Sequence, residues 1–270
     1  MKVAGFDEVQ RGAWAGRAGA FAGSFAKLCA YTAPELLDAA GVGRGTRVLD
    51  VGTGPGTVAG VAARRGAVVT AVDAEPGMVE LARRAVPGAE TLTAVLPELP
   101  FEDGAFDAVV ANFVVNHVGR PREAVAELRR VVRPGGRVAV TIWAAPPAAG
   151  QALVGRAVEA AGATRPSALP RLAAEDDFPR TPEGFAGLLA GAGLREVGCR
   201  SVAWDHRAGA EEWWSGPAAG VGAIGQLVVS QDERTLAEIK RHFDVLAREF
   251  LGEDGLLVLP HEALLASALR

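Results

Sequence analysis

The fold is decided by the stretch Val48-Leu49-Asp50-Val51-Gly52-Thr53-Gly54-Pro55-Gly56. Its apolar start is typical of a short buried strand, and residues 58–65 that follow it have the pattern of a helix. Glycines in such a turn let a ligand approach the backbone closely, and the helix N-terminus supplies unpaired N–H groups. The stretch therefore predicts a strand, a glycine turn and a helix that together form a ligand site.

The same alternation of strand and helix continues on both sides of Asp73. Further strands are expected at residues 67–72, 90–95, 106–113 and 136–143, and helices at 76–85 and 121–132. Strands that alternate with helices at this spacing favour an α/β fold with a doubly wound, mostly parallel sheet.

The flanking segments are expected to add helices around this core. Residues 7–40 have helical spacing, and the rhythm changes after Ala144. Beyond it we expect a helix at 181–192, a strand at 194–206, two or three helices within 209–250, and a final strand bent at Pro260. The simplest organisation is a single domain, residues 1–270, with these parts: an N-terminal helical lid at 1–40, a cofactor-binding core at 44–143, and cap elements at 145–192 and 209–254.

Two details separate the glycine turn from a dinucleotide fingerprint. That fingerprint needs a glycine three positions after its second glycine, where this chain has Thr57. Asp50, at the end of the strand, would repel a diphosphate but attract an α-ammonium group. The turn therefore favours a ligand with a positive amine.

Asp73 ends the second expected strand. A carboxylate at this place can accept hydrogen bonds from both ribose hydroxyls of a nucleoside. The alternative is that Asp73 caps the helix that begins at Pro76. The two interpretations are compatible.

At this point the chain resembles the class I S-adenosylmethionine-dependent methyltransferases, in the branch of the ubiquinone and menaquinone biosynthesis enzymes and many natural-product methyltransferases. The resemblance is carried by four ordered motifs: Val48 to Gly56; Asp73-Ala74-Glu75-Pro76-Gly77-Met78; Leu99-Pro100-Phe101 with Phe106-Asp107; and Glu127-Leu128-Arg129-Arg130-Val131-Val132-Arg133-Pro134-Gly135-Gly136. It implies a seven-stranded, Rossmann-like sheet with one antiparallel strand near its edge.

The resemblance also implies residue roles toward S-adenosyl-L-methionine and its product S-adenosyl-L-homocysteine. The methionine part would lie along Gly52, Thr53 and Gly54, with Asp50 and Gly56 in the same turn. Asp73 would hold the ribose, and the adenine would lie between Ala74 and Met78 and beside Val95 and Leu96. Val95 departs from the family pattern, which has an Asp there. Asn112 and Phe113 would lie beside the methionine amine and the sulfonium.

Methyl transfer from a sulfonium needs alignment of the nucleophile more than acid–base chemistry. His117 is the candidate base or substrate contact, with a structural role as the alternative. Trp14, Trp143 and Trp213 are candidate walls for a flat aromatic or apolar acceptor. Packing in the core is the alternative for such large rings.

Composition restricts the partners. With a net charge of -4 and 28 Lys and Arg against 32 Asp and Glu, the chain is not expected to bind nucleic acid. No apolar run is long enough for a membrane span, and no metal-ligand spacing is present. No signal peptide is expected. Cys29 and Cys199 are expected to be buried free thiols. We expect a cytoplasmic monomer or homodimer that acts on a small molecule, in secondary metabolism. The alternatives are a nicotinamide-dependent oxidoreductase and a non-catalytic, cofactor-binding regulatory protein.

Overall fold

The computed structural model describes residues 5–166 and 172–270, which divide into two compact units. The described residues of unit 1 are 5–28, 146–166 and 203–262; those of unit 2 are 29–145, 172–202 and 263–270. The expected lid at 1–40 is thus divided between the units, and so is the expected cap element at 145–192. The expected core at 44–143 lies wholly in unit 2.

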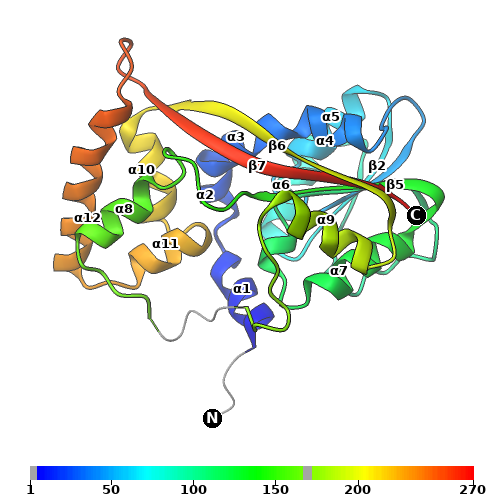
Figure 1. Ribbon diagram of the computed structural model, residues 1–270. Helices are drawn as coiled ribbons and strands as arrows, with labels where there is room; N and C mark the ends of the chain where they lie inside the picture. The colour runs from blue at the N-terminus through cyan, green and yellow to red at the C-terminus, as the bar shows by residue number, and fades with distance from the viewer. Residues whose placement is uncertain (1–4, 167–171) are drawn as a thin grey trace. The chain divides into compact units, whose positions relative to one another are not determined.

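The described residues form one seven-stranded sheet, in the order β3-β2-β1-β4-β5-β7-β6. Figure 1 labels β2, β5, β6 and β7 of this sheet. Its strands are β1 (Arg47–Val51), β2 (Val68–Asp73), β3 (Glu90–Thr93), β4 (Phe106–Asn112), β5 (Val132–Trp143), β6 (Arg195–Ala208) and β7 (Leu257–Leu269). Strands β1 to β5 pair in parallel, whereas β7 pairs antiparallel with β5. The predicted fold class is confirmed, including an antiparallel strand next to the edge of the sheet.

The helices agree with most of the expected positions. They are α1 (Phe6–Trp14), α2 (Ala18–Gly23), α3 (Phe25–Cys29), η1 (Ala30–Thr32), α4 (Ala33–Ala39), α5 (Thr57–Arg64), α6 (Pro76–Ala85), η2 (Val115–His117), α7 (Pro121–Val131), α8 (Leu153–Ala160), α9 (Pro182–Gly191), α10 (Ala210–Ala218), α11 (Gly222–Val229), α12 (Glu233–Leu246) and η3 (Ala247–Phe250). The segment 7–40 is therefore a series of short helices, and 209–250 holds three α-helices and a final 3₁₀ turn.

The core of unit 2 explains why these segments fold as they do. Residues 48–51 of β1 are buried, as expected for a parallel strand covered on both faces. In α7, Ala124, Val125 and Leu128 are fully buried against the sheet, whereas Arg122 and Glu123 face the solvent. This spacing gives the helix one apolar stripe, which packs on the sheet.

Two strand boundaries differ from the expectation. Strand β5 begins at Val132, directly after α7 and before the expected start at residue 136, so Pro134 and Gly135 also belong to the strand. Strand β7 runs without interruption through Pro260, where a bend was expected. Pairing with β5 begins only at Ala263, so Pro260 removes no hydrogen bond from the ladder between β5 and β7.

Unit 1 has a core of its own, rich in aromatic side chains. Trp213 packs against Phe25, His206 and His261, with ring centroids 5.1, 5.3 and 5.3 Å away. Both histidines are buried, and burial lowers their pKa, that of His261 to about 4. These imidazoles are therefore neutral at pH 7. Within residues 5–166 and 172–270, no helix is long and apolar enough to cross a bilayer.

Candidate functional site

The glycine turn between β1 and α5 accepts only glycine at two of its positions. Gly52 has a φ of +67°, and a Cβ there would lie 2.3 Å from Cγ2 of Val114. Gly56 has a φ of +88°, and its Cβ would lie 3.0 Å from the Cα of Ala82 in α6. The turn is therefore packed between the segment after β4 and helix α6, which fixes its backbone N–H groups in place.

Asp50 lies beneath this turn with 1% of its surface exposed. Its Oδ2 accepts hydrogen bonds from the Thr53 hydroxyl (2.7 Å) and the Ala59 N–H (3.0 Å). That N–H belongs to the first turn of α5, where no helical partner is available, so Asp50 helps to cap the helix. The other oxygen, Oδ1, is buried and has no hydrogen-bond partner. Burial raises the pKa of Asp50 to about 6.

Asp73 closes the other side of the turn. Its Oδ2 accepts from the Gly54 N–H (2.9 Å) and its Oδ1 from the Glu75 N–H (3.0 Å). The alternative role for Asp73, as cap of α6, is corrected: Glu75 is the N-cap, because its carboxylate accepts from the Met78 N–H (2.7 Å). Each Asp73 oxygen keeps one lone pair for a further donor.

The residues expected around the adenine come from two neighbouring segments. Ala74 is exposed and Met78 is buried at the start of α6. Val95 and Leu96 follow β3, and this segment is tied to the end of β2 because the Ala94 N–H donates to the Asp73 carbonyl (3.0 Å). Their contact with an adenine stays a prediction, as does the effect of the missing Asp at Val95.

The end of β4 carries a partly buried network of hydrogen bonds that involves Asn112. Its Oδ1 accepts from the hydroxyls of Thr141 (2.6 Å) and Thr32 (2.7 Å), and its Nδ2 donates to the Cys29 carbonyl (2.9 Å). Asn112 therefore joins β4 to β5 and to the 3₁₀ turn η1. Its expected contact with a methionine amine stays a prediction, and it would have to use Oδ1, because an ammonium only donates and Nδ2 is itself a donor.

Phe113 follows with a strained backbone. Its φ of +59° lies in the left-handed region, which costs a bulky L-residue roughly 1–2 kcal/mol. Its ring stacks on Trp143 with centroids 4.1 Å apart and planes 20° from parallel. The structure thus brings together two residues predicted from separate motifs, one for the cofactor and one for the acceptor.

His117 ends the 3₁₀ turn η2, in the same segment of unit 2. Burial lowers the pKa of its imidazole to about 4, so the ring is neutral at pH 7. Full proton transfer from a phenol of pKa about 10 would then be uphill by roughly 8 kcal/mol. A base role for His117 stays a prediction, restricted to partial proton transfer or to a more acidic acceptor.

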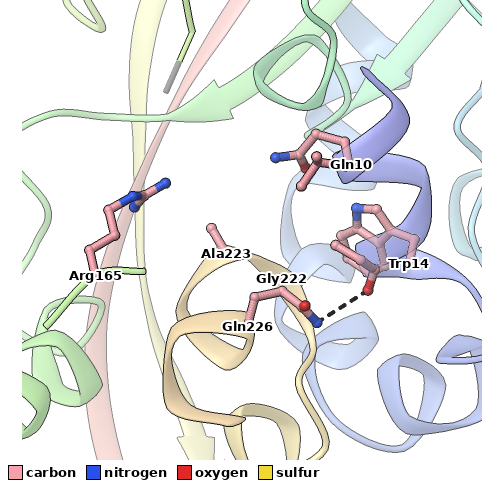
Figure 2. Close-up of a pocket in the computed structure, with 8 residues that line it drawn as sticks. Gln10, Trp14, Arg165, Gly222, Ala223 and Gln226 are labelled. Atoms are coloured by element: carbon pink, nitrogen blue, oxygen red, sulfur yellow. Dashed lines mark hydrogen bonds between the residues drawn. The ribbon is translucent and has the colours of Figure 1, made fainter. Parts of the chain in front are cut away.

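The other two predicted tryptophans lie in unit 1. Trp14 lines a pocket between α1 and α11, together with Gln10, Ala223 and Gln226, and Arg165 lies across from them (Figure 2). Gln226 joins the two helices, because its Nε2 donates to the Ala13 carbonyl (3.4 Å). Trp213 does not line this pocket. It is 5% exposed within the aromatic core of unit 1, which gives it a packing role, and its contact with an acceptor stays a prediction.

Three residues of the site were missed by sequence reasoning. Thr32, Thr141 and Glu75 each hold a group of the site in place, although none was singled out. Thr141 could have been found from the sequence, because it places a hydroxyl within the apolar run of residues 138–142 in a buried strand. Buried polar groups are satisfied by a partner, so such a hydroxyl indicates a specific contact.

The residues present fit the ligand implied by the resemblance. Oδ1 of Asp50 is buried without a hydrogen-bond partner and can accept from an ammonium group, and Asp73 can accept from two ribose hydroxyls. No group of three or more His, Cys, Asp or Glu side chains suited to a metal ion occurs in the part of the chain that the structure describes.

Comparison with known proteins identifies a matching family and similar chains. Residues 49–140 match the family described as a methyltransferase domain. The chain is 41% identical over 106 residues to a demethylmenaquinone methyltransferase of Clavibacter sepedonicus, which covers 38% of the chain and 43% of that protein. It is 36% identical over 176 residues to the demethylmenaquinone methyltransferase of Beutenbergia cavernae, covering 62% of the chain and 72% of that protein. The chain thus spans less than half of the first relative.

Solved structures show the same fold. A methyltransferase structure from Bacillus halodurans superposes with a TM-score of 0.54 at 20% identity and covers 88% of this chain and 97% of its own. The matched residues 49–140 contain the glycine turn, Asp50, Asp73 and the end of β4. The chain belongs to the class I S-adenosylmethionine-dependent methyltransferases, in the branch that contains the demethylmenaquinone methyltransferases.

Proposed function

We propose that this protein transfers a methyl group from S-adenosyl-L-methionine to an O, N or C atom of a small aromatic or apolar molecule. The observation that carries the proposal is the pair of carboxylates at the ends of β1 and β2. Asp50 offers one buried, unpartnered oxygen to an ammonium, and Asp73 offers two acceptors to a ribose. When bound, the sulfonium supplies an already activated methyl group.

The chain's own residues bind and orient the reactants. Thr53 and Ala59 hold Asp50 so that its other oxygen stays available, and Gly54 holds Asp73. Binding of an ammonium stabilises the charged form of Asp50 and offsets the cost of its burial. No strong base is required of His117, because alignment alone supplies much of the rate acceleration of such a displacement.

The acceptor class is proposed from two separate features. In unit 2, the stacked rings of Phe113 and Trp143 offer a flat apolar surface. In unit 1, the pocket beside Trp14 combines an indole with apolar Val9 and Ala13. Quinone-related relatives are consistent with a flat acceptor. A net charge of -4 supports a small molecule over nucleic acid.

The first test is calorimetric titration with S-adenosyl-L-methionine and S-adenosyl-L-homocysteine. Wild type is expected to bind both, and Asp73→Asn to bind neither at the same concentrations. Asp103→Asn is the matched control, because its side chain is 68% exposed and the change in net charge is the same. Absence of binding to wild type would refute the proposal.

Turnover is tested with a panel of reduced 1,4-naphthoquinones, catechols and amines, with products identified by mass spectrometry. A product heavier by one methylene, absent with Asp73→Asn, supports the proposal. Binding without any product would contradict it and favour the non-catalytic alternative.

Trp14 tests the acceptor surface. Trp14→Ala is expected to raise the KM for the acceptor without changing the affinity for S-adenosyl-L-homocysteine, and Trp14→Phe is expected to retain the wild-type KM. An unchanged KM in Trp14→Ala would exclude Trp14 from the acceptor site.

A further inference from the structure

Thr141 contacts two consecutive residues at the end of the neighbouring strand. It is fully buried in β5, opposite Asn112 in the parallel register with β4. Its hydroxyl donates to Oδ1 of Asn112 (2.6 Å) and accepts from the Phe113 N–H (3.0 Å). The hydrogen therefore points to Asn112 and a lone pair to Phe113, so the direction of both bonds is fixed.

The second bond acts on the residue with the strained backbone. The Phe113 N–H lies between two acceptors of the same residue, the Thr141 hydroxyl at 3.0 Å and its carbonyl at 3.1 Å. A left-handed conformation of a non-glycine residue persists only where its surroundings hold it. Here the chain leaves β4 at Phe113, and its ring turns onto Trp143.

The segment that follows Phe113 contacts the glycine turn between β1 and α5. Val114, the next residue, lies so close to Gly52 that a Cβ on Gly52 would meet its side chain. The conformation of Phe113 therefore sets both the stacked pair of rings and the contact of Val114 with the loop that carries Thr53 and Gly54. A change at Thr141 can reach the cofactor loop through these two residues.

We infer that Thr141 is a positioning residue, whose hydroxyl holds Phe113 on Trp143 and thereby shapes the methionine end of the cofactor site. The inference rests on the proposed function. It assigns Thr141 no contact with the reactants. A merely structural role would instead place its importance in the bond to Asn112, which Thr32 shares.

Thr32 provides the matched control. Both threonines are fully buried, and both hydroxyls lie within hydrogen-bond distance of Oδ1 of Asn112. The Thr32 hydroxyl also reaches the Cys29 carbonyl (3.1 Å), whereas only the Thr141 hydroxyl accepts from the Phe113 N–H. Thr141→Val and Thr32→Val therefore each remove a hydroxyl from Asn112, and only the first removes the bond to Phe113. Thr141→Ser keeps the hydroxyl and is the conservative rescue.

Three quantities are measured for each variant: affinity for S-adenosyl-L-homocysteine, the ¹⁹F resonance of 5-fluorotryptophan at position 143, assigned with Trp143→Phe, and the urea unfolding midpoint. Thr141→Val is expected to weaken binding by about tenfold or more and to shift the Trp143 resonance. Thr141→Ser is expected to leave the resonance unchanged and the affinity within about threefold of wild type. Thr32→Val is expected to leave the resonance unchanged and to weaken binding less than Thr141→Val does. Thr141→Cys replaces the valine variant if that variant does not fold.

Three results would overturn the inference. The first is an unshifted Trp143 resonance in folded Thr141→Val, and the second is unchanged affinity in that variant. The third is the same loss of affinity in Thr32→Val, which would assign the effect to Asn112. If wild type binds no S-adenosyl-L-homocysteine, the proposed function fails. The fluorine resonance then decides separately whether Thr141 positions Phe113.

Discussion

Replacement of Asp50 by Asn tests the ammonium site with little change in shape. In the wild type, Oδ2 of Asp50 accepts from Thr53 and Ala59. In the variant the amide oxygen must take this place, since an NH₂ group cannot accept the Ala59 N–H. The NH₂ then replaces the unpartnered Oδ1, so two donors face each other when an ammonium binds.

The expected loss follows from the strength of a charge-assisted hydrogen bond. Such a bond contributes about 1.5–3 kcal/mol, which corresponds to a roughly 10- to 150-fold weaker Kd for S-adenosyl-L-homocysteine. 5′-Methylthioadenosine has the same nucleoside and sulfur but no α-amino group. Its affinity for Asp50→Asn is therefore expected to stay within about threefold of wild type.

Calorimetry with both ligands separates a lost contact from a damaged loop. Asp73→Asn serves as the comparison, because a ribose contact is common to both ligands and both should weaken. The reasoning is refuted if Asp50→Asn weakens both ligands equally, since Asp50 would then act only by shaping the turn. Unchanged affinity for S-adenosyl-L-homocysteine would refute it as well.

Three further predictions concern pH, the glycine turn and His117. Because burial raises the pKa of Asp50 to about 6, its negative charge is present above that pH and lost below it. The affinity for S-adenosyl-L-homocysteine should therefore fall as the pH drops below about 6. In titrations from pH 5 to 8, this fall in affinity should be absent from Asp50→Asn. Gly52→Ala forces a left-handed φ on alanine and places a Cβ against Val114, so urea unfolding should show a free energy of unfolding lower by about 1–3 kcal/mol. A decrease below measurement error would contradict the described packing. Burial lowers the pKa of His117 to about 4, so His117 should not contribute to the pH dependence of kcat/KM between pH 6 and 8, and wild type and His117→Gln should have profiles of the same shape there. A titration in this range that is lost in His117→Gln would show that His117 titrates like an exposed histidine and would contradict its burial.

Local pattern was sufficient for most of the sheet. The apolar runs that form β1, β2 and β4 are buried on both faces. Such runs predict parallel strands even when the neighbouring strands are not known. Helix α6 begins at Pro76 as expected, because a proline fits the first turn. The bend expected at Pro260 was wrong, since a proline interrupts a strand only where its missing N–H is needed.

The cap of α6 shows where the local pattern ends. Asp73 and Glu75 are both acidic residues just before Pro76, and either suits an N-cap by type. In the structure Glu75 is the N-cap of α6, because the Asp73 carboxylate accepts a hydrogen bond from the N–H of Gly54 in the glycine turn. A residue's partner across the fold thus decided between two residues with the same local propensity.

By itself the sequence determined the kind of fold, the glycine turn and the two carboxylates at the ends of β1 and β2, because strand periodicity, glycine and acidic residues at strand ends are visible in short segments. Only the tertiary structure decided that the Gly54 N–H binds Asp73 and that Thr32 and Thr141 meet at Asn112. These contacts join residues far apart in the chain. Their distances depend on how strands and helices pack, and no short segment contains that information.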